Sequence, residues 1–142
     1  MENSKFLVSK IINLLTQSGK KSISEKIIFN LLISLQKKYK INPIKILWIV
    51  LKKIKPCVET INKRKSGKIY QIPKIIKPKR QIKIAIKWLI DINYSSKKRN
   101  LFAQGMLLEI NNIINSKGQS LKKKEKLHRL VESNRIYLHY RW

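Results

Sequence analysis

Residues 57–80 read CVETINKRKSGKIYQIPKIIKPKR, and this is the one stretch of the chain that lacks the pattern of a helix. Two short runs, 57–63 and 68–76, flank a turn at residues 64–67, and the residues around that turn are mostly cationic. Pro73 lies in the second run and has no N–H group to donate, which favours a two-stranded ribbon with free edges over a sheet interior. We therefore predict a basic β-hairpin set between two groups of helices.

On both sides of this stretch, apolar residues recur every three or four positions, the spacing that places one stripe along a helix. The third helix is apolar nearly all round and is predicted to be the most buried. The resulting prediction is a mainly α fold in one domain, 1–142, with six helices and an extended β-hairpin inserted between helices 3 and 4. The predicted helices span about 5–18, 22–38, 43–54, 79–93, 101–117 and 121–137, and the hairpin spans about 57–76.

Several residues mark the expected ends of these helices. Ser22 and Glu25 form a capping-box pattern, a serine with a glutamate three residues later, at the start of the second helix. Asn42 followed by Pro43 is typical of the start of a helix and opens the third. The other predicted signals are caps at Asn100 and Ser120, glycines after helices at Gly19 and Gly118, and inward-facing Leu127, Leu130, Val131 and Leu138 on the last helix.

Positive charge dominates the composition. Lys and Arg total 33 against 7 Asp and Glu, which gives a net charge of +26 over 142 residues. Such a charge weakens the compact state by self-repulsion, and a polyanion relieves it while releasing counterions. If the charges only kept the protein soluble, a mixture of positive and negative residues would suffice. The excess of positive residues therefore predicts binding to RNA, DNA or an anionic membrane. The basic clusters are Lys20–Lys21, 63–65, 77–83, 97–99 and 122–124.

Among these polyanions, the pattern favours a folded RNA. No apolar run approaches the roughly 20 residues of a membrane span, and the cations do not gather on one amphipathic helix. No helix pair has the pattern of a DNA-binding helix-turn-helix, and no dimer seam is present, so we expect no homo-oligomer. A nucleoid- or membrane-binding basic protein is the alternative, and an RNA-processing enzyme a more distant one. Aromatic residues that could stack on unpaired bases are Tyr70, Trp88, Tyr137, Tyr140 and Trp142, although Tyr70 and Trp88 could equally serve packing.

Residues suited to catalysis or metal binding are sparse. His128 and His139 are the only histidines, Cys57 is the only cysteine, and none has the spacing of a metal site or a nucleophile–base pair. The acidic residues show no pairing. We therefore expect no active site, no metal and no cofactor.

Four stretches resemble a known family. They are INLLTQSGKKSISEKIIFNLL (12–32), SGKIYQIP (66–73), IAIKWL (84–89) and KKKEKLHRLVESNRIYLHYRW (122–142). In combination they are similar to the universal family of small-subunit ribosomal protein seven, of the bacterial and organellar type. The chain departs from that family at Leu31, where a small residue is expected, at Ser66, which replaces the first of two glycines, and at Lys87, where Arg is usual.

The resemblance implies a structural constituent of the small ribosomal subunit. Such a protein binds the rRNA of the 3′ major (head) domain directly and helps to start head assembly. Its hairpin lies near the E-site tRNA and the mRNA, and its other partners are neighbouring head proteins. The resemblance implies no enzymatic activity and no membrane partner.

Site residues follow from the clusters and the resemblance together. The predicted rRNA-binding residues are Lys20, Lys21, Lys77, Lys79, Arg80, Lys83, Lys87, Lys97, Lys98, Arg99, Lys122, Lys123, Arg129, Asn134, Arg135, Arg141 and Trp142. The hairpin residues predicted to lie near tRNA and mRNA are Lys63, Arg64, Lys65, Lys68 and Tyr70.

Composition also bears on the compartment. Lys, Ile and Asn, whose codons are AT-rich, are abundant, and the sequence shows neither an import signal nor long terminal extensions. We therefore predict an organelle-encoded protein of the mitochondrial matrix ribosome. A plastid or the cytoplasm of an AT-rich endosymbiont is the alternative.

Overall fold

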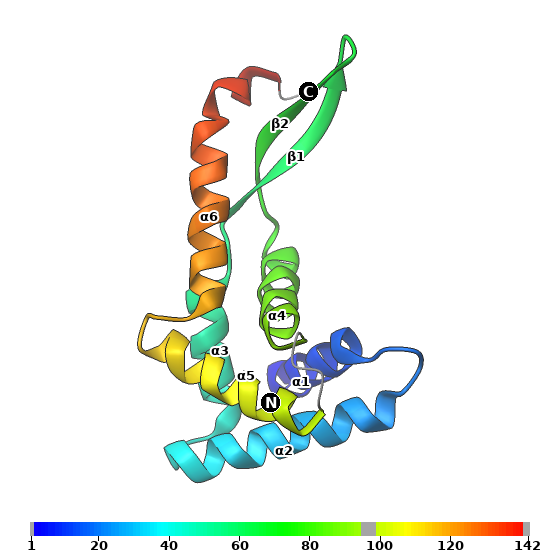
Figure 1. The fold of residues 1–142 in the computed structure, drawn as a ribbon, viewed down its shortest axis with the longest axis vertical. Coiled ribbons are helices and arrows are strands. Elements are labelled where there is room, and N and C mark those ends of the chain that lie inside the picture. The colour runs from blue at the N-terminus through cyan, green and yellow to red at the C-terminus, as the bar shows by residue number, and fades with distance from the viewer. Residues whose placement is uncertain (1, 95–98, 141–142) are drawn as a thin grey trace.

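A computed structural model describes residues 2–94 and 99–140 of the chain. In this range the fold is mainly helical with one antiparallel hairpin between the third and fourth helices, which confirms the predicted fold class. Five helices gather at one end of the long axis, and the hairpin and the sixth helix extend from them (Figure 1). The elements are α1 Glu2–Leu15, α2 Lys21–Tyr39, α3 Pro43–Ile54, β1 Val58–Lys65, β2 Lys68–Ile75, α4 Pro78–Tyr94, α5 Arg99–Ile114, α6 Gln119–Ser133 and a 3-10 helix, η1, Arg135–Tyr140.

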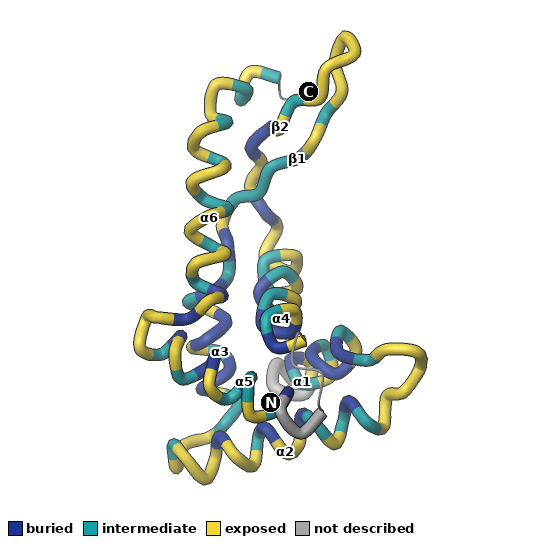
Figure 2. Tube along the Cα trace, viewed as in Figure 1, coloured by how far each residue is buried: buried dark blue, intermediate teal, exposed yellow. Residues whose placement is uncertain are grey.

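The core is built from one apolar stripe on each of α1 to α5. The stripes include Leu7, Leu35, Leu47, Ile86 and Ile110, all of which are almost completely buried. Five of the twelve residues of α3 are buried, in agreement with its predicted central place. Figure 2 shows the buried positions concentrated where these five helices meet.

α6 is the helix whose burial was predicted wrongly. Leu127, Val131 and Leu138 are only half-buried, and Leu130 is 41% exposed. The reason is that α6 leaves the helical body and runs beside the hairpin, so that little of its length meets the core (Figure 1). Ser120, at its first turn, is the residue of α6 that is buried.

The last predicted helix, 121–137, is also two elements rather than one. α6 ends at Ser133, and the backbone N–H and the side-chain amide of Asn134 both donate to the carbonyl of Leu130, at 3.2 and 2.8 Å. By taking that carbonyl, Asn134 closes the helix, and the tighter 3-10 turn of η1 follows.

Two ends near the N-terminus also differ from the prediction. α1 ends at Leu15 rather than at residue 18, because Ser18 and Gly19 form a turn with positive φ of 50° and 73°. α2 begins at Lys21, so Ser22 lies inside the helix and the predicted capping box is absent. The predicted cap at Asn42 is confirmed, since its side-chain oxygen accepts a hydrogen bond from the N–H of Ile44 at 3.0 Å.

The corner between α5 and α6 is closed by an acid rather than by the predicted serine cap. α5 ends at Ile114, and Gly118 directly precedes α6 instead of ending α5. Ser120 donates from its backbone N–H (2.8 Å) and its hydroxyl (3.0 Å) to one carboxylate oxygen of the buried Glu109. A carboxylate at a helix N-terminus satisfies N–H groups and meets the positive end of the helix dipole.

Two further details complete this region. A Cβ on Gly118 would lie 2.5 Å from Cγ1 of Ile113, so the corner has room only for glycine. At the other end of α5 the helix begins at Arg99, which places Asn100 in the first turn and not at the predicted cap.

The hairpin has a shorter turn than predicted. β1 and β2 pair up to Lys65 and Lys68, leaving only Ser66 and Gly67 as the turn. Both turn residues have positive φ, 48° and 79°, as a two-residue type I′ turn requires. Arg64 and Lys65 therefore belong to β1, and Ser66 occupies a left-handed position that glycine fits with less strain.

Replacing Glu109 with alanine should destabilise the fold, because it leaves the buried N–H and hydroxyl of Ser120 without their acceptor. We expect the free energy of unfolding, measured with urea, to fall by about 1–3 kcal/mol. Glu109→Gln keeps an acceptor oxygen and should cost less. Glu125→Ala, at an exposed glutamate of α6, is the matched control with little expected change. Equal effects of the Glu109 and Glu125 alanine variants would contradict the capping role.

Candidate nucleic-acid interface

The base of the hairpin is tied to α4 by an ion pair. Nε of Arg80 donates to both carboxylate oxygens of Glu59 (2.9 and 3.0 Å), and Nη2 donates to Oε2 at 2.9 Å. The hydrogen bond with Glu59 raises the pKa of Arg80 above its ordinary value. One turn of α4 is thereby fixed against β1.

The middle of the hairpin is held by the C-terminal 3-10 helix. The ring of Tyr70 on β2 lies 5.3 Å from that of Tyr137 and 5.2 Å from that of Tyr140. Nζ of Lys65 lies 4.5 Å from the centre of the Tyr140 ring. Aromatic pairs contribute about 0.5–1.5 kcal/mol each beyond the area they bury. Of the two roles open to Tyr70, base stacking and packing, the structure shows packing.

The cations that were predicted on the hairpin are found along its strands, up to the tip. Arg64, Lys65 and Lys68 are exposed next to the turn, whereas Lys63 is half-buried. The tip of the hairpin is exposed and lies away from the helical body (Figure 2), and the residues named above make it cationic.

α4 carries the predicted cationic stripe. Its buried residues include Ala85, Ile86 and Leu89, and the basic side chains lie on exposed positions of the same helix. Trp88 is partly buried against the core and therefore serves packing. The exposed cations of this region are Lys77, Lys79, Arg80, Lys83 and Lys87.

On α6, Lys122, Lys123 and Arg129 are exposed, as is Arg135 just beyond it. Asn134 has an intramolecular role instead, since its side chain donates to the carbonyl of Leu130 and to Oε1 of Gln71.

Two lysines have a structural role that the sequence did not reveal. Nζ of Lys124 donates to the carbonyl of Lys53 at 2.8 Å, and Nζ of Lys53 donates to the carbonyl of Ile114 at 2.8 Å. Both accepting carbonyls lie at helix C-termini, where lysine satisfies unpaired oxygens and meets the negative end of the dipole. Only the packing of α3, α5 and α6 brings these groups together, so no local sequence signal could have found them.

The remaining predicted residues lie elsewhere. Lys20 and Lys21 are exposed at the α1–α2 connection, at the end of the molecule away from the hairpin tip (Figure 1). Nζ of Lys21 is 4.0 Å from a carboxylate oxygen of Glu25. Arg99 is the first residue of α5. Lys97, Lys98, Arg141 and Trp142 lie outside the described residues.

Within residues 2–94 and 99–140, no group of three or more His, Cys, Asp or Glu is placed to hold a metal ion. None of the helices described is both long enough and apolar enough to cross a membrane.

Comparison with known proteins decides the family. The family model described as "Ribosomal protein S7p/S5e" matches residues 1–135. The chain belongs to this family. Its similar relatives include a protein of Wigglesworthia glossinidia brevipalpis that is 38% identical over 136 residues, covering 96% of this chain and 86% of the relative. A protein of Paracoccus denitrificans is 37% identical over 138 residues with the same coverage, and one of Buchnera aphidicola is 34% identical over 140 residues.

Each of these three bacterial relatives is named "Small ribosomal subunit protein uS7". The family consists of ribosomal structural proteins and is not known for enzymes. Membership therefore confirms the predictions of a structural ribosomal protein of the small subunit and of a chain without an enzymatic role.

Removing the ring of Tyr137 should loosen the hairpin. In Tyr137→Ala we expect amide hydrogen exchange in β2 to accelerate about fivefold, equivalent to about 1 kcal/mol of lost local stability, while exchange in α3 is unchanged.

The matched control is Phe29→Ala, since the side chain of Phe29 is 55% exposed on α2, away from the hairpin. If Tyr137→Ala accelerated exchange equally in β2 and α3, the tyrosine would stabilise the whole fold and not the hairpin in particular.

Proposed function

We propose that this chain binds the rRNA of the 3′ major domain directly and helps to nucleate assembly of the small-subunit head. The observation that carries the proposal is the exposed cationic surface on α4, the hairpin and α6, together with membership of the ribosomal family. In this region the carboxylate of Glu59 is paired with Arg80, and the exposed acids Asp91, Glu125 and Glu132 are outnumbered by exposed lysines and arginines. The surface offered to a phosphate backbone is therefore rich in cations.

In this proposal the protein acts by holding RNA helices in fixed positions. Lysine and arginine side chains neutralise phosphates and release counterions, which supplies affinity without reading sequence. The cations lie on elements that point in different directions, so one protein can fix the relative positions of several RNA helices. Within this proposal Lys20 and Lys21 hold RNA at the α1–α2 end. Lys97, Lys98, Arg99, Arg141 and Trp142 remain predicted contacts.

The hairpin is proposed to lie near the E-site tRNA and the mRNA. Two features support this: the hairpin extends away from the helical body, and its tip is cationic (Figure 1). Neighbouring head proteins are the remaining proposed partners.

For the compartment, we propose a mitochondrial ribosome and an organelle-encoded chain, on the strength of the AT-rich codons that its Lys, Ile and Asn content implies. The relatives reported above are bacterial, which keeps the plastid and the endosymbiont cytoplasm as alternatives. Hybridising a probe for the coding sequence to purified mitochondrial, plastid and bacterial DNA separates the three.

Changing Lys79, Lys83 and Lys87 together to alanine tests the α4 surface. The variant should bind a 3′ major domain transcript more weakly, and the slope of log affinity against log salt should become shallower by about 2–3. A filter-binding titration at several salt concentrations, with a 5′ domain transcript as the competitor RNA, measures both quantities.

The matched control changes three exposed lysines on or beside α2, Lys26, Lys37 and Lys40, which lie outside the proposed surface. Equal loss of slope in both triple variants would indicate diffuse charge binding. Equal affinity of the natural chain for the 3′ and 5′ transcripts would favour a general basic nucleic-acid-binding protein and contradict the proposal.

A further inference from the structure

The two longest stretches of the sequence without lysine or arginine are residues 27–36 and 100–116. The first lies within α2, and the second covers all of α5 except Arg99. These two helices pack against each other at the end of the molecule away from the hairpin tip (Figure 1). The hydroxyl of Tyr39 on α2 donates to the side-chain oxygen of Asn111 on α5. A chain of net charge +26 thus brings its longest cation-free stretches together in the fold.

Burial in the core does not account for the missing charge, because many of these residues are exposed. Phe29 and Ile33 are 55% and 51% exposed and, being four residues apart, lie on one face of α2. Leu108 of α5 is 61% exposed. We call these three residues, with the exposed polar ones of the same two stretches of helix, the α2–α5 surface. The polar members are Asn30, Ser34, Gln36, Gln104 and Asn112, all of them neutral.

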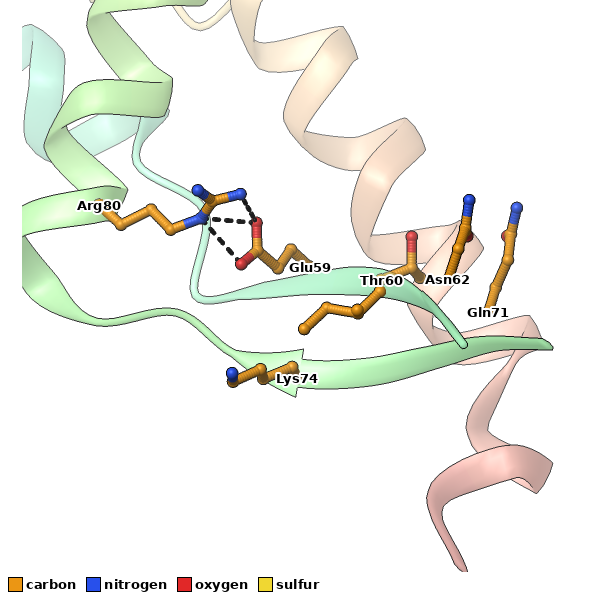
Figure 3. Close-up of a pocket in the computed structure, with 7 residues that line it drawn as sticks. Glu59, Thr60, Asn62, Gln71, Lys74 and Arg80 are labelled. Carbon is orange, nitrogen blue, oxygen red and sulfur yellow. Dashed lines mark hydrogen bonds and ion pairs between the residues drawn. The ribbon is translucent and has the colours of Figure 1, made fainter. Parts of the chain in front are cut away.

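The base of the hairpin has a different composition. Figure 3 shows Lys74 and Arg80 there, together with Glu59, which is paired with Arg80. Phosphates bind where cations are exposed, because the affinity comes from neutralising phosphate charge and releasing counterions. The α2–α5 surface offers no cation to a phosphate, so it does not suit RNA.

Apolar side chains among neutral polar ones are typical of a protein interface. The centre of such an interface is enriched in aromatic and apolar groups and poor in lysine, while the rim is polar. Phe29 supplies an aromatic group to the α2–α5 surface. Lys26 and Lys37, both exposed, lie one turn before Phe29 and one turn after Ile33, as rim residues would. The composition of the surface therefore favours a protein as the partner.

The charge of the molecule narrows the choice of protein. A second protein that binds the same RNA directly carries excess positive charge of its own. Two such proteins repel each other wherever their cations meet, so they can make contact only through surfaces that lack cations. The α2–α5 surface meets this condition in a chain whose other helices and strands all contain lysine or arginine at exposed positions.

We propose that the α2–α5 surface is the docking site of a second cationic RNA-binding protein, which covers Phe29, Ile33 and Leu108 with neutral, apolar side chains. The inference rests on the proposed role in the small subunit and identifies the part of this chain that meets a neighbouring protein. The cationic surfaces bind RNA, and the cation-free surface binds protein.

Hydroxyl-radical labelling of side chains, measured by mass spectrometry, tests the proposal in three states of the full chain. The states are the free chain, its complex with a protein-free 3′ major domain transcript, and the complete reconstituted small subunit. Phe29 and Leu108 should be labelled equally in the first two states. In the complete subunit their labelling should fall about tenfold, because the centre of a protein interface is almost fully desolvated.

Leu108→Lys places a cation on the α2–α5 surface. It should weaken association of the neighbouring protein about tenfold or more, the effect of disrupting one central interface residue. Quantitative mass spectrometry of subunits assembled with limiting protein measures this as the depletion of one protein. Affinity for the 3′ major domain transcript should not fall. Ile49→Lys is the matched control, since it adds the same charge at an aliphatic side chain of α3 that is 53% exposed and lies outside the surface.

Four results would overturn the proposal. Protection of Phe29 and Leu108 by the transcript alone would mean that RNA covers the surface, and protection that grows with the concentration of the free chain would mean a second copy. Unchanged labelling in the complete subunit, or equal depletion in the Leu108 and Ile49 variants, would mean that no protein docks there. Selective binding of the 3′ transcript by a chain that stays unprotected in the subunit removes only the docking site and leaves the proposed function intact.

Discussion

Self-repulsion of a +26 net charge is the constraint on which the rest of this structure depends. With only seven acids, the chain cannot balance its cations with surface ion pairs. Two of these acids join elements instead: Glu109 closes the α5–α6 corner, and Glu59 ties β1 to α4. Lys53 and Lys124 meet backbone carbonyls at helix ends. The remaining cations can therefore stay on the surface, available to a polyanion.

The hairpin shows how this arrangement serves function. A two-stranded ribbon is marginally stable in water by itself, and this one is also cationic. It is held at its base by Arg80 and at its middle by Tyr137 and Tyr140. Arg80 and Tyr70, predicted from the sequence as RNA contacts, thus have a structural task as well: they hold the hairpin that carries the exposed cations. α6 packs against β1, and η1 packs against β2.

Much of the fold could be predicted because its signals are local. The apolar stripes predicted the core helices, and the Asn42 cap predicted the start of α3. The absence of helical spacing predicted the hairpin. What failed depends on tertiary contacts. Glu109 lies eleven residues before Ser120, and only the folded corner brings them together. Leu130 has helical spacing but is exposed, because α6 leaves the core. The exposed stripes of cations were predicted correctly. The intramolecular partners of Arg80, Tyr70 and Lys124 were not predicted, because they lie on elements far away in the sequence.

One measurement tests most directly the claim that the hairpin and α4 face the rRNA. Cys57 is the only cysteine and is exposed at the base of the hairpin, so an iron chelate can be attached there alone. Hydroxyl radicals generated in the reconstituted small subunit then cut the nearby RNA. The account predicts cuts clustered in the 3′ major domain. Cuts in the 5′ domain, or an rRNA left intact by a fully labelled and incorporated chain, would contradict it.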